Sequence, residues 1–124
     1  MSGVGLKGKR VYISGPMSGL PAMNRPAFRR AAEELEALGA YPFDPANAWE
    51  HDDKPYEWCM LHDLRMLTQI SDYVRGVPFF DLLVLLPGFE SSQGALIELS
   101  VARACGIDCR LAEDVLGPEW GDCR

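Results

Sequence analysis

The stretch Phe79-Phe80-Asp81-Leu82-Leu83-Val84-Leu85-Leu86 decides the fold class. Successive residues of a strand point to opposite faces of the sheet, so this segment would present apolar side chains on both faces. A strand of that kind belongs at the centre of a parallel sheet that helices cover on each side. The segment therefore predicts an α/β fold whose sheet is buried between two helical layers.

Strand and helix patterns alternate on both sides of this segment. Before it, the pattern predicts strands over 11–14 and 40–43 and helices over 24–38 and 56–67. After it, a turn over 87–93 precedes a helix over 94–105 and a strand over 107–111. Parallel strands are joined through helices by right-handed crossovers. We therefore expect one domain over 1–124, a Rossmann-like or flavodoxin-like three-layer α/β/α sandwich with a mostly parallel sheet of four to five strands.

Three segments carry no clear helix or strand pattern. The polar stretch 46–55 is predicted to be a loop. The stretch 71–78 either extends the preceding helix or forms a mobile lid. The tail after Glu113 is predicted to be a surface segment.

Composition and charge exclude several classes of protein. The chain has 124 residues, of which 48% are hydrophobic and 24% charged, as in soluble domains that bury a core. Its net charge of −6 argues against binding to a nucleic acid polymer, which depends on clustered cations. No apolar run approaches the ~20 residues of a membrane helix, and no signal peptide is evident. We therefore expect a cytoplasmic protein with no membrane partner.

The cysteines and histidines give no metal-binding pattern. The cysteines form no Cys-x-x-Cys pair, and the histidines have no zinc-like spacing to them. We therefore expect reduced thiols, no metal and no cofactor. The residues concerned are Cys59, Cys105, Cys109, Cys123, His51 and His62.

Two loops should meet at one edge of the sheet. In open parallel sheets, ligands bind past the carboxyl ends of the strands, which places the loops 15–19 and 87–94 on the same rim. The glycines of the first loop let backbone N–H groups approach an anion or a sugar, although such a loop is more often only a turn. In the second loop, Ser92 either caps the following helix, which is the more common outcome, or helps to take a phosphate.

Glu98 is an isolated carboxylate in an apolar helix, and a solvent-facing position is its ordinary interpretation. On a helix, however, Glu98 stacks near Gly94, where the missing side chain leaves room for a ligand. The other candidates also have ordinary alternatives. Asp63 could be an exposed helix residue, Asp81 could begin a strand, and Tyr12 could be core packing.

Three motifs combine these candidates: Val11-Tyr12-Ile13-Ser14-Gly15-Pro16-Met17-Ser18-Gly19, His62-Asp63-Leu64 and Ser92-Gln93-Gly94-Ala95-Leu96-Ile97-Glu98. Together they resemble the nucleoside 2-deoxyribosyltransferase superfamily, especially its small nucleotide N-hydrolase branch and a related phage and bacterial family of unassigned function. The likeness spans most of 12–111. We expect the cytoplasm concerned to be that of a bacterium or of a phage-infected host.

The resemblance implies a reaction and a set of roles. Glu98 would attack the anomeric carbon of a nucleoside or, preferably, its 5′-monophosphate, and water or a second base would resolve the glycosyl-enzyme intermediate. Asp63 would be the acid/base, and Tyr12 would orient the nucleophile. A homodimer or higher homo-oligomer is implied as well. The implied substrate- and phosphate-binding residues are Gly15, Met17, Ser18, Gly19, Asp81, Ser92 and Gly94.

General chemistry agrees with this division of roles, because two carboxyl groups can act as nucleophile and acid/base at a glycosidic bond. A glutamate with an ordinary pKa of about 4.3 is ionised at neutral pH, and repulsion would raise the pKa of a second carboxyl nearby. We therefore expect an ionised Glu98 and a protonated Asp63. One departure concerns Asp63, which lies 98 − 63, or 35, positions before Glu98, more than the resemblance leads us to expect.

Two other functional classes remain open. A nucleotide sensor would keep the rim but lack turnover, and a small interaction protein would use the glycine-rich loop only as a turn. Release of base from a panel of nucleosides and nucleotides separates the enzyme from both.

Overall fold

A computed structural model describes residues 5–49 and 53–121 of the chain. Its central sheet consists of four parallel strands in the order β2-β1-β5-β6, which confirms the predicted α/β class and parallel sheet. The central strand β5 is shorter than the predicted segment 79–86. The strands are β1 (Arg10–Ser14), β2 (Tyr41–Phe43), β5 (Leu82–Leu85) and β6 (Asp108–Leu111).

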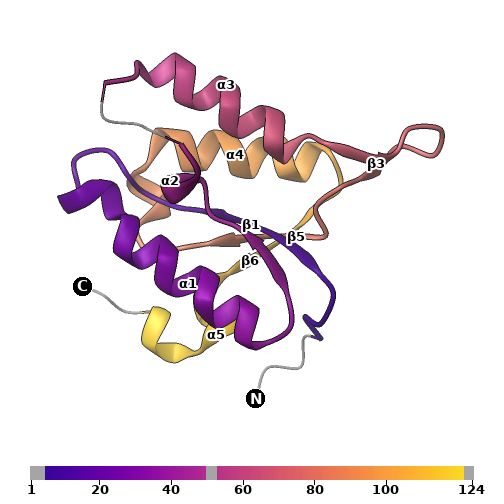
Figure 1. Ribbon diagram of the computed structural model, residues 1–124, viewed down its shortest axis with the longest axis horizontal. Helices are drawn as coiled ribbons and strands as arrows, with labels where there is room; N and C mark the ends of the chain where they lie inside the picture. Colours follow the sequence, from indigo (N-terminus) through magenta and orange to yellow (C-terminus); the bar gives the residue numbers. More distant parts are fainter. Residues whose placement is uncertain (1–4, 50–52, 122–124) are drawn as a thin grey trace.

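Helices cover both faces of the sheet, as the sandwich prediction requires. On one face lie α1 (Arg25–Ala37) and α5 (Ala112–Leu116), and on the other lie α3 (Tyr56–Leu67) and α4 (Gln93–Ala104). Figure 1 shows α3 and α4 side by side above the sheet, with α1 and α5 below it. The three layers are therefore α/β/α.

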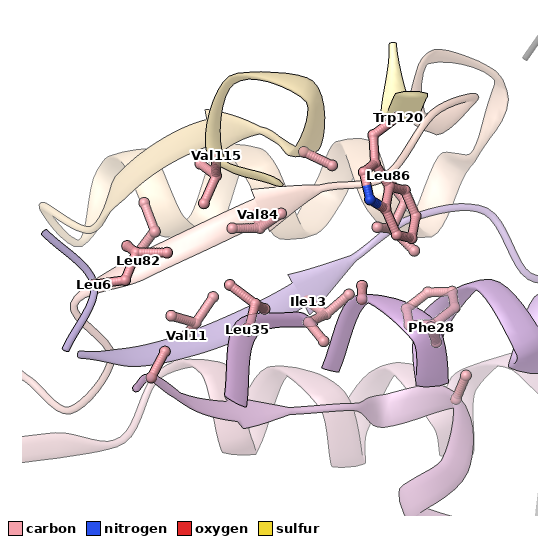
Figure 2. Close-up of a cluster of buried hydrophobic side chains, with 14 residues drawn as sticks. Leu6, Val11, Ile13, Phe28, Leu35, Leu82, Val84, Leu86, Val115 and Trp120 are labelled. Carbon is pink, nitrogen blue, oxygen red and sulfur yellow. The ribbon is translucent and has the colours of Figure 1, made fainter. Parts of the chain in front are cut away.

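The alternation of side chains along β1 and β5 divides the core in two. Val11, Ile13 and Val84 point toward α1 and α5, where Leu35 is among the buried residues that meet them (Figure 2). Tyr12, whose partner in the register is Leu83 of β5, points to the α3/α4 face. Each strand therefore supplies one face to each core, which explains why 82–86 is apolar without a break.

The helix α1 follows from its spacing of apolar residues. Phe28, Ala31 and Leu35 lie one turn apart and are all fully buried, while Gly39 takes φ +88° just after the helix. The preceding 3-10 turn η1 (Pro21–Asn24) is unusual, because three successive non-glycine residues, 22–24, have φ between 53° and 60°.

Two predictions about the connecting segments are wrong in whole or in part. Residues 46–48 of the predicted loop 46–55 belong to the short helix α2 (Pro45–Ala48), which begins there because the Asp44 side chain accepts a hydrogen bond from the backbone N–H of Asn47. Residues 50–52 of the same prediction lie outside the described residues. The stretch 71–78 is neither a helical extension nor a lid. It belongs to an antiparallel hairpin of β3 (Ile70–Asp72) and β4 (Val77–Pro78), which projects from the end of α3 (Figure 1).

The C-terminal segment is not a simple surface tail. Helix α5 and the 3-10 turn η3 (Pro118–Trp120) bury Ala112, Val115 and Trp120 against the α1 side of the sheet (Figure 2). The Trp120 indole N–H donates to Glu34 Oε1 at 2.8 Å, which fixes this segment on α1. His51 and Cys123, which enter the expectations about metals and thiols, lie outside the described residues.

Candidate active site

A cavity of about 800 Å³ lies past the carboxyl ends of β1 and β5. Its volume falls within the range of about 300–1,000 Å³ that is typical of small-molecule sites. Both predicted loops contribute to it, so the rim that the sequence predicts is present. The lining residues come from these loops and from α3 and α4: Gly15, Pro16, Met17, Ser18, Leu20, Met23, Lys54, Tyr56, Cys59, Met60, Asp63, Pro87, Gly88, Glu90, Ser91, Ser92, Gln93, Gly94, Ala95 and Glu98.

Glu98 reaches this cavity from α4 with both carboxylate oxygens engaged. The Tyr12 hydroxyl donates to Oε2 at 2.7 Å, and the Ser14 hydroxyl donates to Oε1 at 2.6 Å. Only 5% of Glu98 is exposed to solvent, so the alternative of a solvent-facing carboxylate is wrong. Tyr12 and Ser14 are two residues apart on β1, and strand alternation therefore aims both hydroxyls at the same helix.

Tyr12 is fixed by its aromatic neighbours. Its ring centroid lies 5.5 Å from those of Phe43 and Phe80, and its side chain is fully buried. Its hydroxyl oxygen also lies 3.5 Å from the carbonyl oxygen of Asp63. Burial and the neighbouring carboxylate of Glu98 raise the pKa of Tyr12 well above its ordinary value, so the phenol remains a proton donor.

Asp63 is the second buried carboxyl at the cavity. It lies on α3, is 6% exposed and lines the cavity with Glu98. Its Oδ1 accepts a hydrogen bond of 2.7 Å from the indole N–H of Trp49. The structure thus brings the predicted pair to one cavity, and the alternative of an exposed Asp63 is wrong.

The electrostatics of the pair differ from the sequence-based expectation. Burial raises the pKa of Glu98 to about 7, against the lowering effect of the Ser14 and Tyr12 hydrogen bonds, and Asp63 raises it further. Burial, rather than repulsion, raises the pKa of Asp63 to about 6, while the Trp49 hydrogen bond and His62 lower it. The expectation of an ordinary pKa for Glu98 is therefore wrong, because desolvation acts on both carboxyls.

The N-terminus of α4 forms one wall of the cavity. The Ser92 hydroxyl caps the helix by accepting a hydrogen bond from the Ala95 N–H at 3.1 Å, which is the more common of its two predicted roles. The N–H groups of Gln93 and Gly94 lie in the first turn, where no intrahelical acceptor exists. A Cβ at Gly94 would lie 3.4 Å from Met60 Sδ, so the glycine keeps the cavity open between α3 and α4.

The loop after β1 forms the opposite wall. Gly15 is required there, because a Cβ would lie 2.8 Å from the Leu86 Cβ. The Asn24 side-chain amide donates to the Pro16 carbonyl at 2.8 Å and ties the loop to the 3-10 turn before α1. Met17 and Ser18 line the cavity as predicted, whereas Gly19, with φ +82°, is not among the lining residues.

Asp81 is not brought to this site. It precedes β5, at the amino end of the parallel sheet, whereas the cavity lies past the carboxyl ends. Its Oδ2 accepts a hydrogen bond of 2.9 Å from the backbone N–H of Arg10, at the start of β1. Asp81 therefore does not take its expected part in substrate binding. It forms a structural contact between the starts of β1 and β5.

Sequence reasoning missed several residues of the site. The two-residue period of β1 could have identified Ser14, since it shares a face with Tyr12. Trp49 carries no such signal, because it follows a helix that was predicted to be a loop. The cavity is also lined by Lys54, Tyr56 and Met60. Their position there depends on the packing of α3 beside α4, which the sequence alone does not show.

Two negative observations complete the description. Within 5–49 and 53–121, no group of three or more His, Cys, Asp or Glu side chains could hold a metal ion. Within the same ranges, no helix is long and apolar enough to cross a membrane.

The chain belongs to the family described as Domain of unknown function (DUF4406), whose model matches residues 9–110. The matched range includes Tyr12, Asp63, Glu98 and both loops of the cavity, whereas Trp120 lies beyond it. No curated protein and no solved structure matches the chain.

Proposed function

We propose that this protein cleaves, or transfers a group at, the N-glycosidic bond of a (2′-deoxy)nucleoside, preferably its 5′-monophosphate, with Glu98 as nucleophile. Membership in the nucleoside 2-deoxyribosyltransferase superfamily is part of this proposal. One observation carries it: a buried Glu98 meets a cavity of ligand size, its two oxygens held by Tyr12 and Ser14, with Asp63 on the same cavity.

The proposed reaction has two steps. In the first, a Glu98 oxygen forms a bond to the anomeric carbon while the bond from that carbon to the base nitrogen breaks, and Asp63 gives its proton to the leaving base. In the second, Asp63 takes a proton from water, or from the nitrogen of a second base, as that nucleophile displaces Glu98. Asp63 is then protonated again, and Glu98 is an ionised carboxylate.

The raised pKa of Glu98 is compatible with this division of roles. In the free protein, the pKa values of about 7 for Glu98 and about 6 for Asp63 place a shared proton preferentially on Glu98. Moving it to Asp63 costs on the order of 1 kcal/mol, since one pKa unit corresponds to roughly that free energy. This is small beside the ~8–23 kcal/mol by which enzymes lower barriers. The two hydroxyl donors on Glu98 also favour its ionised form.

The preference for a monophosphate rests on one wall of the cavity. Unpaired N–H groups at the start of a helix bind anions, and the first turn of α4, at Gln93 and Gly94, lines the cavity. Lys54, which precedes α3, supplies a cationic side chain to the lining of the same cavity. We therefore propose that the 5′-phosphate lies at the N-terminus of α4 and the sugar lies over Glu98.

The decisive experiment is incubation of the protein with nucleosides and 5′-monophosphates of each base, with and without an acceptor base, followed by chromatography of the free base. We expect release from a monophosphate by the wild type and at least a ~1,000-fold slower release by Glu98→Gln. Glu57→Gln, which removes an exposed carboxyl of α3 away from the cavity, should match the wild type.

The nucleophile itself can be located with a slowly turned-over 2′-fluoro substrate. Mass spectrometry should find the sugar on the peptide that contains Glu98, whereas attachment to Asp63 would reverse the two roles. Saturable nucleotide binding without product, unchanged in Glu98→Gln, would instead favour a nucleotide sensor.

We also propose that the protein works as a homodimer or higher homo-oligomer. The outer side of the α3/α4 layer exposes large apolar residues, with Leu61 71% and Leu96 42% exposed, and the neighbouring hairpin exposes Tyr73 and Val74. Several exposed large apolar residues on neighbouring elements are consistent with a surface that packs against a partner. Light scattering of the wild type and of Leu61→Glu tests this proposal: the wild type should have the mass of at least two chains, and the variant the mass of one.

A further inference from the structure

The indole of Trp49 contacts the proposed acid/base at one specific atom. Its Nε1–H lies 2.7 Å from Asp63 Oδ1, and the two residues come from different segments, since Trp49 follows α2 and Asp63 is on α3. Asp63 lines the cavity, whereas Trp49 does not. The indole therefore contacts the carboxyl group without itself lining the cavity.

The chemistry of indole determines what this contact can do. An indole N–H donates a hydrogen bond and has no lone pair with which to accept one. Oδ1 must therefore act as an acceptor whether Asp63 is ionised or protonated. In a protonated carboxyl group the carbonyl oxygen accepts a hydrogen bond better than the hydroxyl oxygen does, so this contact favours a proton on Oδ2.

We propose that Trp49 is a positioning residue that keeps the proton of Asp63 on Oδ2, the oxygen that the indole does not engage. This inference rests on the proposed function. In the first step of that reaction, the Oδ2–H bond breaks and its proton goes to the leaving nitrogen, which keeps the electron pair of the broken glycosidic bond. In the second step, Oδ2 takes a proton from the incoming nucleophile.

The aromatic residues around Trp49 hold its indole in this orientation. Its ring packs edge-on against Trp58 at 6.5 Å and against His62 at 5.2 Å, and it lies 6.0 Å from the ring of Phe43. Trp58 stacks on His62 at 3.7 Å, and the His62 Nδ1 lies 2.9 Å from the Trp58 carbonyl oxygen. Trp49 therefore has little freedom to turn away from Asp63.

Other ionisable groups lie near Asp63 and affect how its protonation depends on pH. Burial raises the pKa of Asp63 to about 6, while the Trp49 hydrogen bond and His62 lower it. Removal of that hydrogen bond should therefore raise the value. The ionisable groups around Asp63 are Cys59 and His62 on α3, Tyr12 on β1, Glu98 on α4 and Lys54 before α3.

The first test is an NMR titration of the free protein, which does not depend on the substrate. The indole N–H signal of Trp49 should titrate with a midpoint near pH 6, and this transition should disappear in Asp63→Asn. At pH 5 the indole proton should remain protected from exchange with solvent, because Oδ1 still accepts. Rapid exchange at pH 5, at the rate of the Trp58 indole, would place the proton on Oδ1 and overturn the inference.

The second test compares Trp49→Phe with Trp58→Phe. Both keep an aromatic ring, but only the first removes a hydrogen bond to a carboxyl group, since Trp58 has no such partner in the described part of the chain. The carboxyl carbon signal of Asp63 should titrate about 0.5–1 pH unit higher in Trp49→Phe. It should move little in Trp58→Phe, and equal shifts in both variants would contradict the role of the indole.

Kinetics provide a readout that a purely structural role would not move. If the wild type releases base, Trp49→Phe should lower kcat about tenfold or more with little change in KM, and the alkaline limb of its pH profile should move to higher pH. Trp58→Phe should stay within about twofold of the wild type. An unchanged kcat and pH profile in Trp49→Phe would contradict the inference. If the wild type releases no base, the proposed reaction fails, while the NMR titrations still decide where the proton of Asp63 resides.

Discussion

The hydroxyl oxygen of Tyr12 lies 2.7 Å from Glu98 Oε2, although 86 positions separate the two residues in the chain. One residue belongs to β1, one of the two central strands, and the other to the second turn of α4. The hydrogen bond therefore joins the sheet to the helix at the point where both reach the cavity. A buried carboxylate held in this way has a fixed orientation toward any ligand that enters.

Tyr12→Phe removes this hydroxyl and keeps the ring that packs against Phe43 and Phe80. Because the hydroxyl stabilises the ionised form of Glu98, its loss should raise the pKa of Glu98 further and slow base release about 10–100-fold. A pH–rate profile measures both effects. Tyr41→Phe, at an exposed tyrosine of β2, is the matched control and should retain wild-type rates.

Ser14→Ala removes the donor to the other oxygen of Glu98. We expect slower base release and a higher pKa of Glu98, as in Tyr12→Phe. Because both hydroxyls act on one carboxylate, the double variant should deviate from the product of the two single effects. A double-mutant cycle of kcat/KM measures this coupling, and Ser100→Ala, at an exposed serine of α4, serves as control. Independent, multiplicative losses would argue against a shared target.

The stability of the protein should depend on pH through Glu98. Its pKa is about 7 in the folded state and 4.5 in the reference state, so the folded protein binds more protons between these values. The free energy of unfolding should therefore fall as pH rises from about 4.5 to 7, by up to about 3 kcal/mol from this group. Asp63 adds a contribution of the same sign between 3.8 and about 6.

Urea unfolding of the wild type and Glu98→Gln across pH 5–8 isolates the contribution of Glu98. The variant should gain stability relative to the wild type as pH rises, because glutamine cannot ionise in the buried position. Parallel curves for the two proteins would show that the Glu98 carboxyl keeps an ordinary pKa.

Gly15→Ala should destabilise the protein by about 1–3 kcal/mol, since the new Cβ would lie 2.8 Å from the Leu86 Cβ and one of the two strand ends must shift. Gly5→Ala, where a Cβ meets nothing within 4 Å, is the control. Urea unfolding measures both. Equal stability of Gly15→Ala and the wild type would show that the end of β5 can move away without loss.

Trp120→Ala should destabilise the protein by about 3–5 kcal/mol, as expected when a large buried aromatic side chain is removed. Trp120 is 4% exposed. The substitution also removes the hydrogen bond from the indole to Glu34 and the contact of the ring with the Arg30 guanidinium, which lies 4.6 Å from the ring centroid. Tyr73→Ala, at an 81% exposed aromatic residue of the hairpin, should change stability by less than about 0.5 kcal/mol. Both values follow from urea unfolding.

The layers of the fold could be predicted from the sequence because periodicity is a local property. The apolar run around Leu83 identifies the central strand, and the spacing of Phe28, Ala31 and Leu35 identifies a helix that covers the sheet. The C-terminal segment could not be predicted in the same way. Trp120 is buried because it packs against α1, which is distant in the sequence. The local pattern of polar and apolar residues does not predict such a long-range contact.

The candidate site, too, was predictable only in part from the sequence. The sequence by itself determined the parallel sheet and the two rim loops, because periodicity and turn residues are local properties. The expectation that Tyr12, Asp63 and Glu98 act together at that rim came from the resemblance of their motifs to a known superfamily. Only the tertiary structure decided how these groups are charged and oriented. The pKa of a carboxyl depends on how fully its neighbours exclude water, and the contact of Trp49 with Asp63 depends on how α2 and α3 pack. Both are properties of groups that meet only after the chain has folded.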